Sequence, residues 1–215
     1  MNQSLKKTIN TRYPNVKIVL ASKYLESKSD FLPFVEAGQT EFGENRAEVL
    51  EEKIEWLKAY PVKWHYIGTL QTKKVKKIIN DIDCLHALDR LKLADEIEKR
   101  RVGVLPCFIQ VNISDEPQKH GFDVNDVEPF LEAIKGYQHI DVIGLMGMAS
   151  DTEDEKKIRQ QFQTLRDLRD TLQEKYPKLK ELSMGMSQDY QIALEEGATV
   201  LRLGRIMLTE GYHGT

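Results

Sequence analysis

Lys23 stands just behind an apolar run and is the first residue whose type suggests chemistry. In VKIVLASK, the residues from Val16 to Ala21 have the composition of a buried strand, and Lys23 follows two residues later. A lysine at a strand end commonly extends its ammonium group into water. Partial burial beside a second cation such as Arg202 would instead favour the neutral amine, which attacks carbonyl groups. Lys23 is therefore a candidate for a covalent bond to an aldehyde.

Two segments near the end of the chain suit a phosphate group. LSMGMSQDYQIAL passes from an apolar run into a helical pattern, with Ser187 at the expected N-cap position. In RLGR, Gly204 allows the backbone to approach an anion, and the amides around Gly204 and Arg205 can donate to it. The plain alternatives are that Ser187 only caps its helix and that Gly204 only turns the chain. With Lys23, these motifs indicate a ligand with an aldehyde and a phosphate: pyridoxal 5′-phosphate (PLP), or a sugar phosphate in a cofactor-free Schiff-base aldolase.

Apolar runs alternate with helical patterns along the whole chain. The eight expected strands are VKIVLAS, QTEFGEN, KWHYIG, DIDCLHAL, LPCFIQVN, IDVIGLMGM, ELSMGM and ATVLRLG. The seven helical patterns span 30–37, 47–59, 71–80, 89–101, 124–136, 153–176 and 189–196. Apolar strands that are each followed by a helix predict a parallel sheet, and eight such units exceed the usual open doubly wound sheet. We therefore predict an α/β fold, a single (β/α)8 TIM barrel in one domain from 1 to 215.

This architecture would bring the polar residues together, because barrel proteins carry their functional groups at the carboxyl ends of the strands. Lys23 ends the first expected strand, and Arg202 lies in the last. The other residues expected at this end are Glu44, Asn45, Arg46, His65, Gly68, Asn112, Met146 and the MGMS segment.

Composition narrows the class of protein. The chain has 31 Lys and Arg against 34 Asp and Glu, a net charge of −3, which argues against a nucleic-acid binder. Its two cysteines and scattered histidines have no metal-ligand or disulfide spacing. The start, MNQSLKKTIN, has no apolar signal core, and no run is long enough to cross a membrane. We expect a cytoplasmic protein with no metal, no membrane contact and no nucleic-acid partner.

Seven motifs resemble one known family in order and spacing. ASKY, FGENRAE, WHYIGTLQTKK, VNISDEPQKHGF, GLMGM, LSMGMSQDY and LRLG together identify the chain as similar to the YggS/PROSC (YlmE-like) family of pyridoxal phosphate homeostasis proteins. This family resembles the barrel domain of alanine racemase, and the resemblance runs from about Val16 to Leu208. It implies an alanine racemase N-terminal-domain-like barrel that holds PLP as an internal aldimine, a Schiff base, on Lys23.

The resemblance also implies roles for further residues. Ser187 and the backbone near Gly204 and Arg205 would hold the phosphate, and Arg202 would face the pyridine nitrogen. Asn45, His65 and Met184 would line the ring and its surroundings. The plain alternative for Arg202 is an ion pair that closes the barrel. Because a guanidinium only donates hydrogen bonds, Arg202 would favour an unprotonated ring and weak support for carbanion chemistry.

The chain departs from the family pattern at three places. Arg205 stands where the family often has Thr or Ser, Lys73 stands where it commonly has Asn, and the segment before the first strand is short, as if a leading helix were trimmed. The loss of a hydroxyl at Arg205 could weaken phosphate binding. Tyr24, directly after Lys23, is expected to point to the opposite face of the strand and to serve packing.

Carriage of PLP is the function that these features favour. Racemization needs two bases, and we expect no further domain beyond Thr215 to supply the second. We therefore predict a non-catalytic, monomeric PLP carrier in vitamin B6 homeostasis, with apo PLP-dependent enzymes as possible recipients. A racemase-like PLP enzyme acting on amino acids is the alternative, followed by the aldolase.

Overall fold

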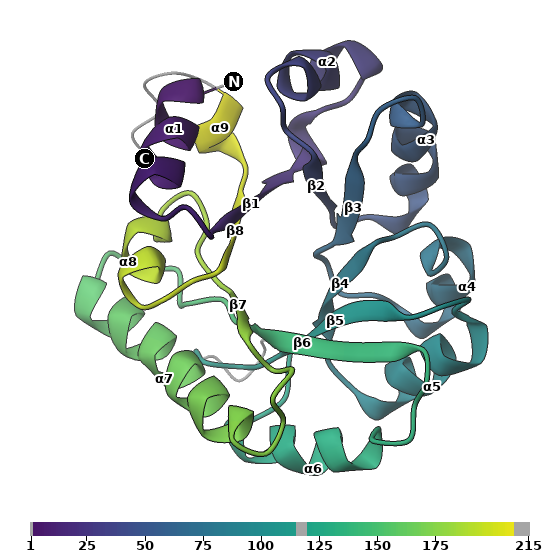
Figure 1. Ribbon diagram of the computed structural model, residues 1–215, viewed down its shortest axis with the longest axis vertical. Coiled ribbons are helices and arrows are strands. Elements are labelled where there is room, and N and C mark those ends of the chain that lie inside the picture. The colour runs from purple at the N-terminus through teal and green to yellow at the C-terminus, as the bar shows by residue number, and fades with distance from the viewer. Residues whose placement is uncertain (1, 115–119, 209–215) are drawn as a thin grey trace.

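Eight parallel strands close into a barrel in the computed structural model, which describes residues 2–114 and 120–208 (Figure 1). The strands are β1 (Lys17–Ala21), β2 (Glu41–Glu44), β3 (Lys63–Tyr66), β4 (Cys84–Leu88), β5 (Leu105–Gln110), β6 (Ile140–Met146), β7 (Glu181–Ser183) and β8 (Val200–Leu203). Each strand pairs with the next along the chain, and β8 returns to β1 with Leu20 opposite Leu203. All eight predicted runs contain a strand, and the predicted TIM-barrel fold is confirmed.

Helices surround the barrel, as Figure 1 shows. They are α1 (Gln3–Arg12), α2 (Lys28–Glu36), α3 (Ala47–Leu57), α4 (Val75–Ile78), α5 (Leu91–Arg100), α6 (Val127–Ala133), α7 (Glu155–Gln173), α8 (Tyr190–Glu195) and α9 (Arg205–Leu208). Short 3-10 turns are η1 (Ser22–Tyr24), η2 (Thr72–Lys74) and η3 (Val124–Asp126). The predicted helical patterns correspond to α2 through α8.

The helix α7 shows how the sequence produces an outer-ring element. Asp154 caps it, accepting hydrogen bonds from the amides of Lys156 (3.0 Å) and Lys157 (3.2 Å). Its buried apolar positions recur every three to seven residues and pack against the sheet; they are Ile158, Phe162, Leu165 and Leu172.

Sequence reasoning did not assign α1 or α9 to a range. The side chain of Asn2 caps α1, because its Oδ1 accepts from the amide of Leu5 (2.9 Å). The same residue contacts the other end of the chain: its backbone N–H donates to the carbonyl of Met207 (2.9 Å). The short segment before β1 therefore holds a helix of ten residues that packs beside α9.

Two apolar clusters lie among the described residues. The larger lies between the strands and the helices and includes the aromatic rings of Phe31, Phe42 and Trp64, with Phe31 and Phe42 centroids 5.4 Å apart. The smaller lies inside the barrel; its buried members are Val19, Cys84, Ala87, Phe108, Met146 and Val200. The strands are therefore covered on both faces, as parallel strands require.

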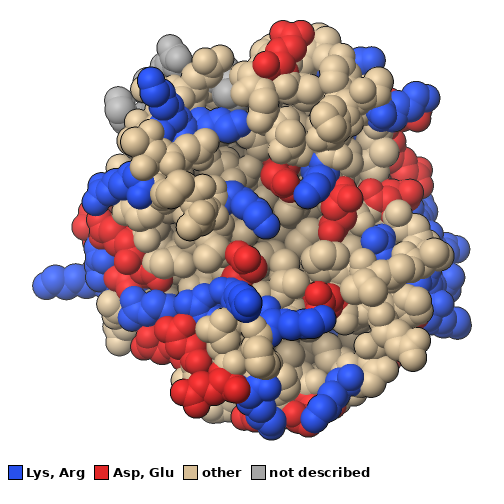
Figure 2. Space-filling view, viewed as in Figure 1, with Lys and Arg blue, Asp and Glu red and all other residues tan. Residues whose placement is uncertain are grey.

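Lys and Arg side chains lie among Asp and Glu side chains over the face seen in Figure 2, in keeping with the small net charge of −3. Among the described residues, none of the helices combines the length and the apolar character needed to cross a membrane.

Candidate ligand pocket at the carboxyl ends of the strands

A pocket of about 420 Å³ lies at the carboxyl ends of the strands. Six of the eight predicted site residues line it: Lys23, Asn45, Ser187, Arg202, Gly204 and Arg205. Sequence reasoning did not assign a ligand role to several others that also line it: Tyr24, Thr69, Gln110, Met148, Met186 and Gln188. Loops after several strands thus contribute to one pocket, as the barrel architecture predicts.

Lys23 stands in η1, immediately after β1 ends at Ala21. Its side chain is exposed, so the expectation of a partly buried amine is wrong for the protein alone. The amine Nζ lies 4.8 Å from the centroid of the Tyr24 ring. Tyr24 is 39% exposed and lines the pocket, so its predicted packing role on the opposite face is also wrong. The physical reason is that the strand has already ended, so alternation of side chains no longer applies.

Arg202 is only 5% exposed and is held by the neighbouring strands. Its Nη1 donates to the carbonyl and the Oγ of Ser183 (both 2.7 Å), and its Nη2 donates to the carbonyl of Gly147 (3.0 Å). Burial lowers the pKa of Arg202 to about 10, against the opposing charge of Asp189. The guanidinium therefore stays charged at neutral pH, in an orientation fixed by β7 and the end of β6.

The phosphate-side residues lie in two loops. Ser187 is half-buried in the turn before α8, and the N-cap is Asp189, so the predicted cap role of Ser187 is wrong. Asp189 lies two residues after Ser187. Its Oδ1 accepts a hydrogen bond from the amide of Met186 (2.6 Å), and this bond closes the turn. A Cβ placed on Gly204 would meet nothing nearer than Tyr24 Cε2, at 3.5 Å. Packing therefore does not require glycine at position 204, and the missing side chain leaves room in the pocket.

His65 and Met184 are not among the residues that line this pocket, and their contact with a ligand stays a prediction. Met184 is fully buried in the cluster between strands and helices, because the preceding residue, Ser183, points into the barrel. His65 precedes the last residue of β3, and its ring lies in the barrel interior, bonded to Glu41 and His86. Both side chains are buried.

A row of hydrogen bonds crosses the barrel interior from Glu41, at the start of β2, to Arg202. Glu41 Oε2 lies 2.6 Å from His65 Nε2, and His65 Nδ1 lies 2.8 Å from His86 Nε2. His86 Nδ1 lies 2.8 Å from Ser183 Oγ, which also accepts from Arg202. With both rings neutral, only one direction gives every contact a donor: Ser183 to His86, His86 to His65, and His65 to Glu41.

Electrostatics support this assignment. Complete burial, with the charges of His65 and Arg202, lowers the pKa of His86 well below 6.5. Burial by itself would raise the pKa of Glu41, but the hydrogen bond and charge of His65, with Lys63 and Lys17, lower it overall. The row therefore connects a neutral His86, through His65, to the carboxylate of Glu41.

Sequence spacing did not indicate that His65, Cys84 and His86 would meet, yet their potential ligand atoms lie within 4.8 Å of one another. The ring nitrogens of both histidines already belong to the hydrogen-bonded row. Burial also raises the pKa of the Cys84 thiol, which disfavours the thiolate that a metal would need. We assign no metal to this cluster.

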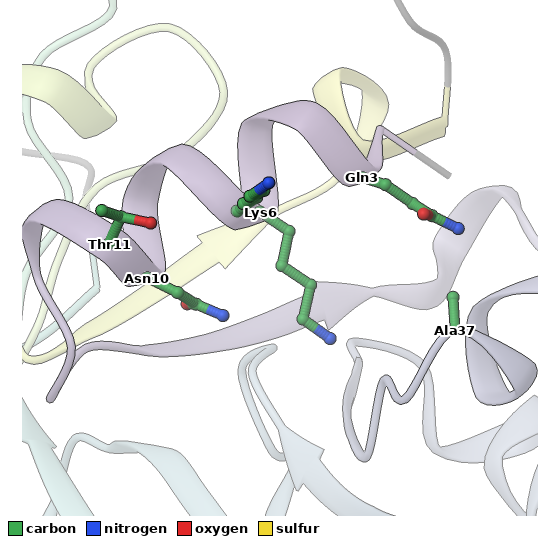
Figure 3. Close-up of a pocket in the computed structure, with 6 residues that line it drawn as sticks. Gln3, Lys6, Asn10, Thr11 and Ala37 are labelled. Carbon is green, nitrogen blue, oxygen red and sulfur yellow. The ribbon is translucent and has the colours of Figure 1, made fainter.

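A second pocket, of about 410 Å³, lies between α1 and the end of α2 (Figure 3). It is lined by Gln3, Lys6, Lys7, Asn10, Thr11 and Ala37. These residues are exposed or half-buried, and the Lys6 amine donates to the carbonyl of Gly38 (3.1 Å). This pocket contains none of the predicted site residues, so the carboxyl-end pocket is the candidate functional site.

The chain forms a closed (β/α)8 barrel, and one pocket at the carboxyl ends of its strands has a lysine, a buried arginine and a glycine loop. These features define a ligand-binding barrel of the kind that accepts phosphorylated small molecules. Residues 7–210 match the family model described as alanine racemase, N-terminal domain. The chain belongs to this family and, within it, to the pyridoxal phosphate homeostasis proteins.

Relatives and solved structures cover nearly the whole chain. The pyridoxal phosphate homeostasis protein of Aquifex aeolicus (strain VF5) is 39% identical over 181 residues, 82% of this chain and 79% of the relative. That of Helicobacter pylori (strain 26695) is 35% identical over 209 residues, 95% of this chain and 92% of the relative. The family resemblance inferred from the motifs is confirmed.

Solved structures give the same result. PipY of Synechococcus elongatus PCC7942, in its structure with PLP bound, aligns with a TM-score of 0.86 and 27% identity, covering 97% of this chain and 99% of that chain. Alanine racemase from Corynebacterium glutamicum has 12% identity and a TM-score of 0.71, covering 97% of this chain and 60% of that chain, and so shares the fold.

Proposed function

We propose that this protein binds PLP in the carboxyl-end pocket, through a C=N bond to Lys23, and serves in PLP homeostasis and carriage rather than in turnover of a substrate. The observation that carries the proposal is the meeting of Lys23, Arg202 and Gly204 in one pocket of about 420 Å³. The names of the relatives and the PLP in the PipY structure support the choice of ligand over a sugar phosphate.

The residues present fit this cofactor. The Lys23 amine would condense with the aldehyde carbon, with formation of a C=N bond and release of one water molecule. Because a Cβ at Gly204 would have no neighbour nearer than 3.5 Å, the backbone there leaves room for an anion beside the amides of Gly204 and Arg205. The Ser187 hydroxyl, half-buried in the facing turn, would donate to the same anion. Asn45, which also lines the pocket, would contact the ring or its substituents.

Arg202 supports binding over turnover. When bound, PLP supplies an electron sink whose strength depends on protonation of its ring nitrogen. The hydrogen bonds described for Arg202 use three of its five N–H donors, so donors remain for a ring nitrogen that accepts. Because the pKa of Arg202 is about 10, its guanidinium stays protonated at neutral pH. It therefore cannot accept a hydrogen bond from a protonated ring nitrogen. We therefore propose that amino-acid racemization or decarboxylation is not its activity, and that it acts as a monomer that passes PLP to apo-enzymes.

The test is chemical trapping. We expect the purified protein to absorb visible light, and borohydride to attach the cofactor irreversibly to the peptide that contains Lys23. Lys23→Ala should abolish both signals, while Lys28→Ala, which changes an exposed lysine at the start of α2, should change neither. An adduct on another residue, or none, would contradict the proposal. Steady alanine racemization that depends on Lys23 would contradict the binding role.

A further inference from the structure

A buried ion pair lies beneath the pocket and outside its lining. Lys53, on α3, is 3% exposed, and Glu44, the last residue of β2, is fully buried. Lys53 Nζ and Glu44 Oε2 are 2.5 Å apart. Sequence reasoning placed Glu44 among the residues at the barrel end but did not find its partner, which lies nine positions later on the following helix.

The ammonium group of Lys53 holds the residue that precedes Lys23. Its Nζ donates to the backbone carbonyl of Ser22 (2.8 Å) and approaches Ser22 Oγ (3.5 Å). Ser22 is fully buried, and its hydroxyl contacts the carbonyl of Gly43 and Glu44 Oε2, both at 3.0 Å. The turn that carries Lys23 is therefore fixed to β2 and α3 through its first residue.

The carboxylate of Glu44 holds the segment that carries Asn45. Its Oε1 accepts from the backbone amides of Asn45 (2.8 Å) and Arg46 (3.0 Å). The Tyr66 hydroxyl donates to the carbonyl of Asn45 (3.2 Å), and burial raises the pKa of Tyr66 to about 12, so this donor keeps its proton. Both peptide groups of Asn45 are thus bonded to buried side chains.

Stability alone does not explain such a pair. Removing two charges from water costs as much as their attraction returns, so a well-packed apolar pair of similar size can be equally stable. Each charge here also makes hydrogen bonds to the backbone of a pocket loop, which an apolar pair cannot make. The same bonds occupy the Lys53 amine with Ser22 and Glu44 and keep it buried, whereas Lys23 is the lysine that lines the pocket.

We propose that Lys53 and Glu44 are positioning residues for the PLP site. The pair holds the Lys23 turn and the Asn45 loop at the separation that the cofactor needs, and it leaves Lys23 as the reactive amine. This inference rests on the proposed function, because the geometry is proposed to matter for PLP.

The test removes both charges together, since a lone buried charge would destabilise the fold by itself. The variant is Lys53→Met with Glu44→Gln. Its matched control is Glu196→Gln, which disrupts a buried carboxylate held by Arg159 (2.7 Å) and Arg166 (2.5 Å) on α7, outside the pocket lining. Two quantities are measured where circular dichroism shows native protein: the PLP dissociation constant by absorbance titration, and hydrogen exchange of the ligand-free protein in segments 20–26 and 43–48.

We expect the double variant to bind PLP at least about tenfold more weakly, the effect of losing one hydrogen bond to a charged group, and to exchange faster in both segments. The control should match the wild type in both measurements. If the double variant is not native, Lys53→Arg replaces it: it keeps the charge, but its planar donors differ from those of the ammonium group, so both measurements should change in the same directions.

The inference would be overturned if a natively folded variant bound PLP as tightly as the wild type while its two loop segments exchanged hydrogen faster. The loops would then be less rigid without any effect on PLP binding. Unchanged exchange with unchanged affinity would overturn it as well, and would leave the pair only a structural role. If the wild type itself binds no PLP, the proposed function fails and the inference fails with it, whatever the exchange data show about the loops.

Discussion

Acid should destabilise this fold through His86, and replacement of His86 should remove part of that sensitivity. His86 is fully buried, stacked 4.5 Å from the Phe108 ring centroid, and its folded-state pKa lies well below 6.5. The unfolded chain therefore binds a proton at this residue in a pH range where the folded protein does not. Stability is present above the unfolded pKa and is lost as the pH falls through 6.5 toward the folded pKa.

The magnitude follows from linkage. With the folded pKa below the range, one histidine costs about 1.4 kcal/mol of unfolding free energy between roughly pH 7.5 and pH 5.5. This window lies above the ordinary pKa range of Asp and Glu, so carboxylates such as Glu41 contribute little to it. His86→Gln should be less stable at pH 7.5 because it disturbs a buried hydrogen-bonded row, but its loss of stability on acidification should be smaller by about 1.4 kcal/mol.

The assay is urea unfolding of the wild type and His86→Gln at the two pH values, followed by circular dichroism. His120→Gln is the control, because His120 is exposed and its side chain is outside the row. Parallel pH profiles for the wild type and His86→Gln would refute the reasoning, since they would show that His86 does not carry the linked proton.

Three further predictions concern the pocket. Gly204→Ala should change the unfolding free energy in urea by less than about 0.5 kcal/mol, because its Cβ makes only ordinary contacts, yet it should weaken PLP retention in absorbance titrations; unchanged retention would show that the anion does not approach Gly204. Tyr24→Leu removes the ring that lies 4.8 Å from the Lys23 amine, a contact worth about 0.5–1 kcal/mol at an exposed site, so the rate of C=N formation measured by stopped-flow absorbance should change roughly two- to fivefold, and an unchanged rate would contradict this. Arg205→Thr should retain PLP on dialysis as long as the wild type or longer; rapid loss would mean that the guanidinium holds the phosphate directly.

The order of strands and helices could be predicted because it depends on local patterns. The runs IVL in β1 and CLHAL in β4 are buried on both faces, and the apolar composition of each run indicates this without knowledge of its neighbours. The residue at which a strand ends is harder to predict. An apolar run can continue past the last residue that pairs with the neighbouring strand. Tyr24 was assigned to the wrong face for this reason.

The contacts between elements could not be predicted, since they depend on the register of strands that are distant in sequence. His65 and His86 lie 21 positions apart and meet only because β3 and β4 pair with His65 opposite Cys84. A signal did exist: single polar residues interrupt apolar strands at His86, Ser183 and Arg202. Each of them points into the barrel, where a polar group needs a partner.

The row from Glu41 to Arg202 can take up an additional proton and still give every contact a donor. If His65 takes it up, its ring donates at both nitrogens, and the His86 nitrogen that faces it must turn from donor to acceptor. The hydrogen of His86 then moves to the side of Ser183, whose own hydroxyl hydrogen has to leave that contact. A proton gained at His65 would thus reverse each successive bond and reach, through His86, the serine that holds the arginine.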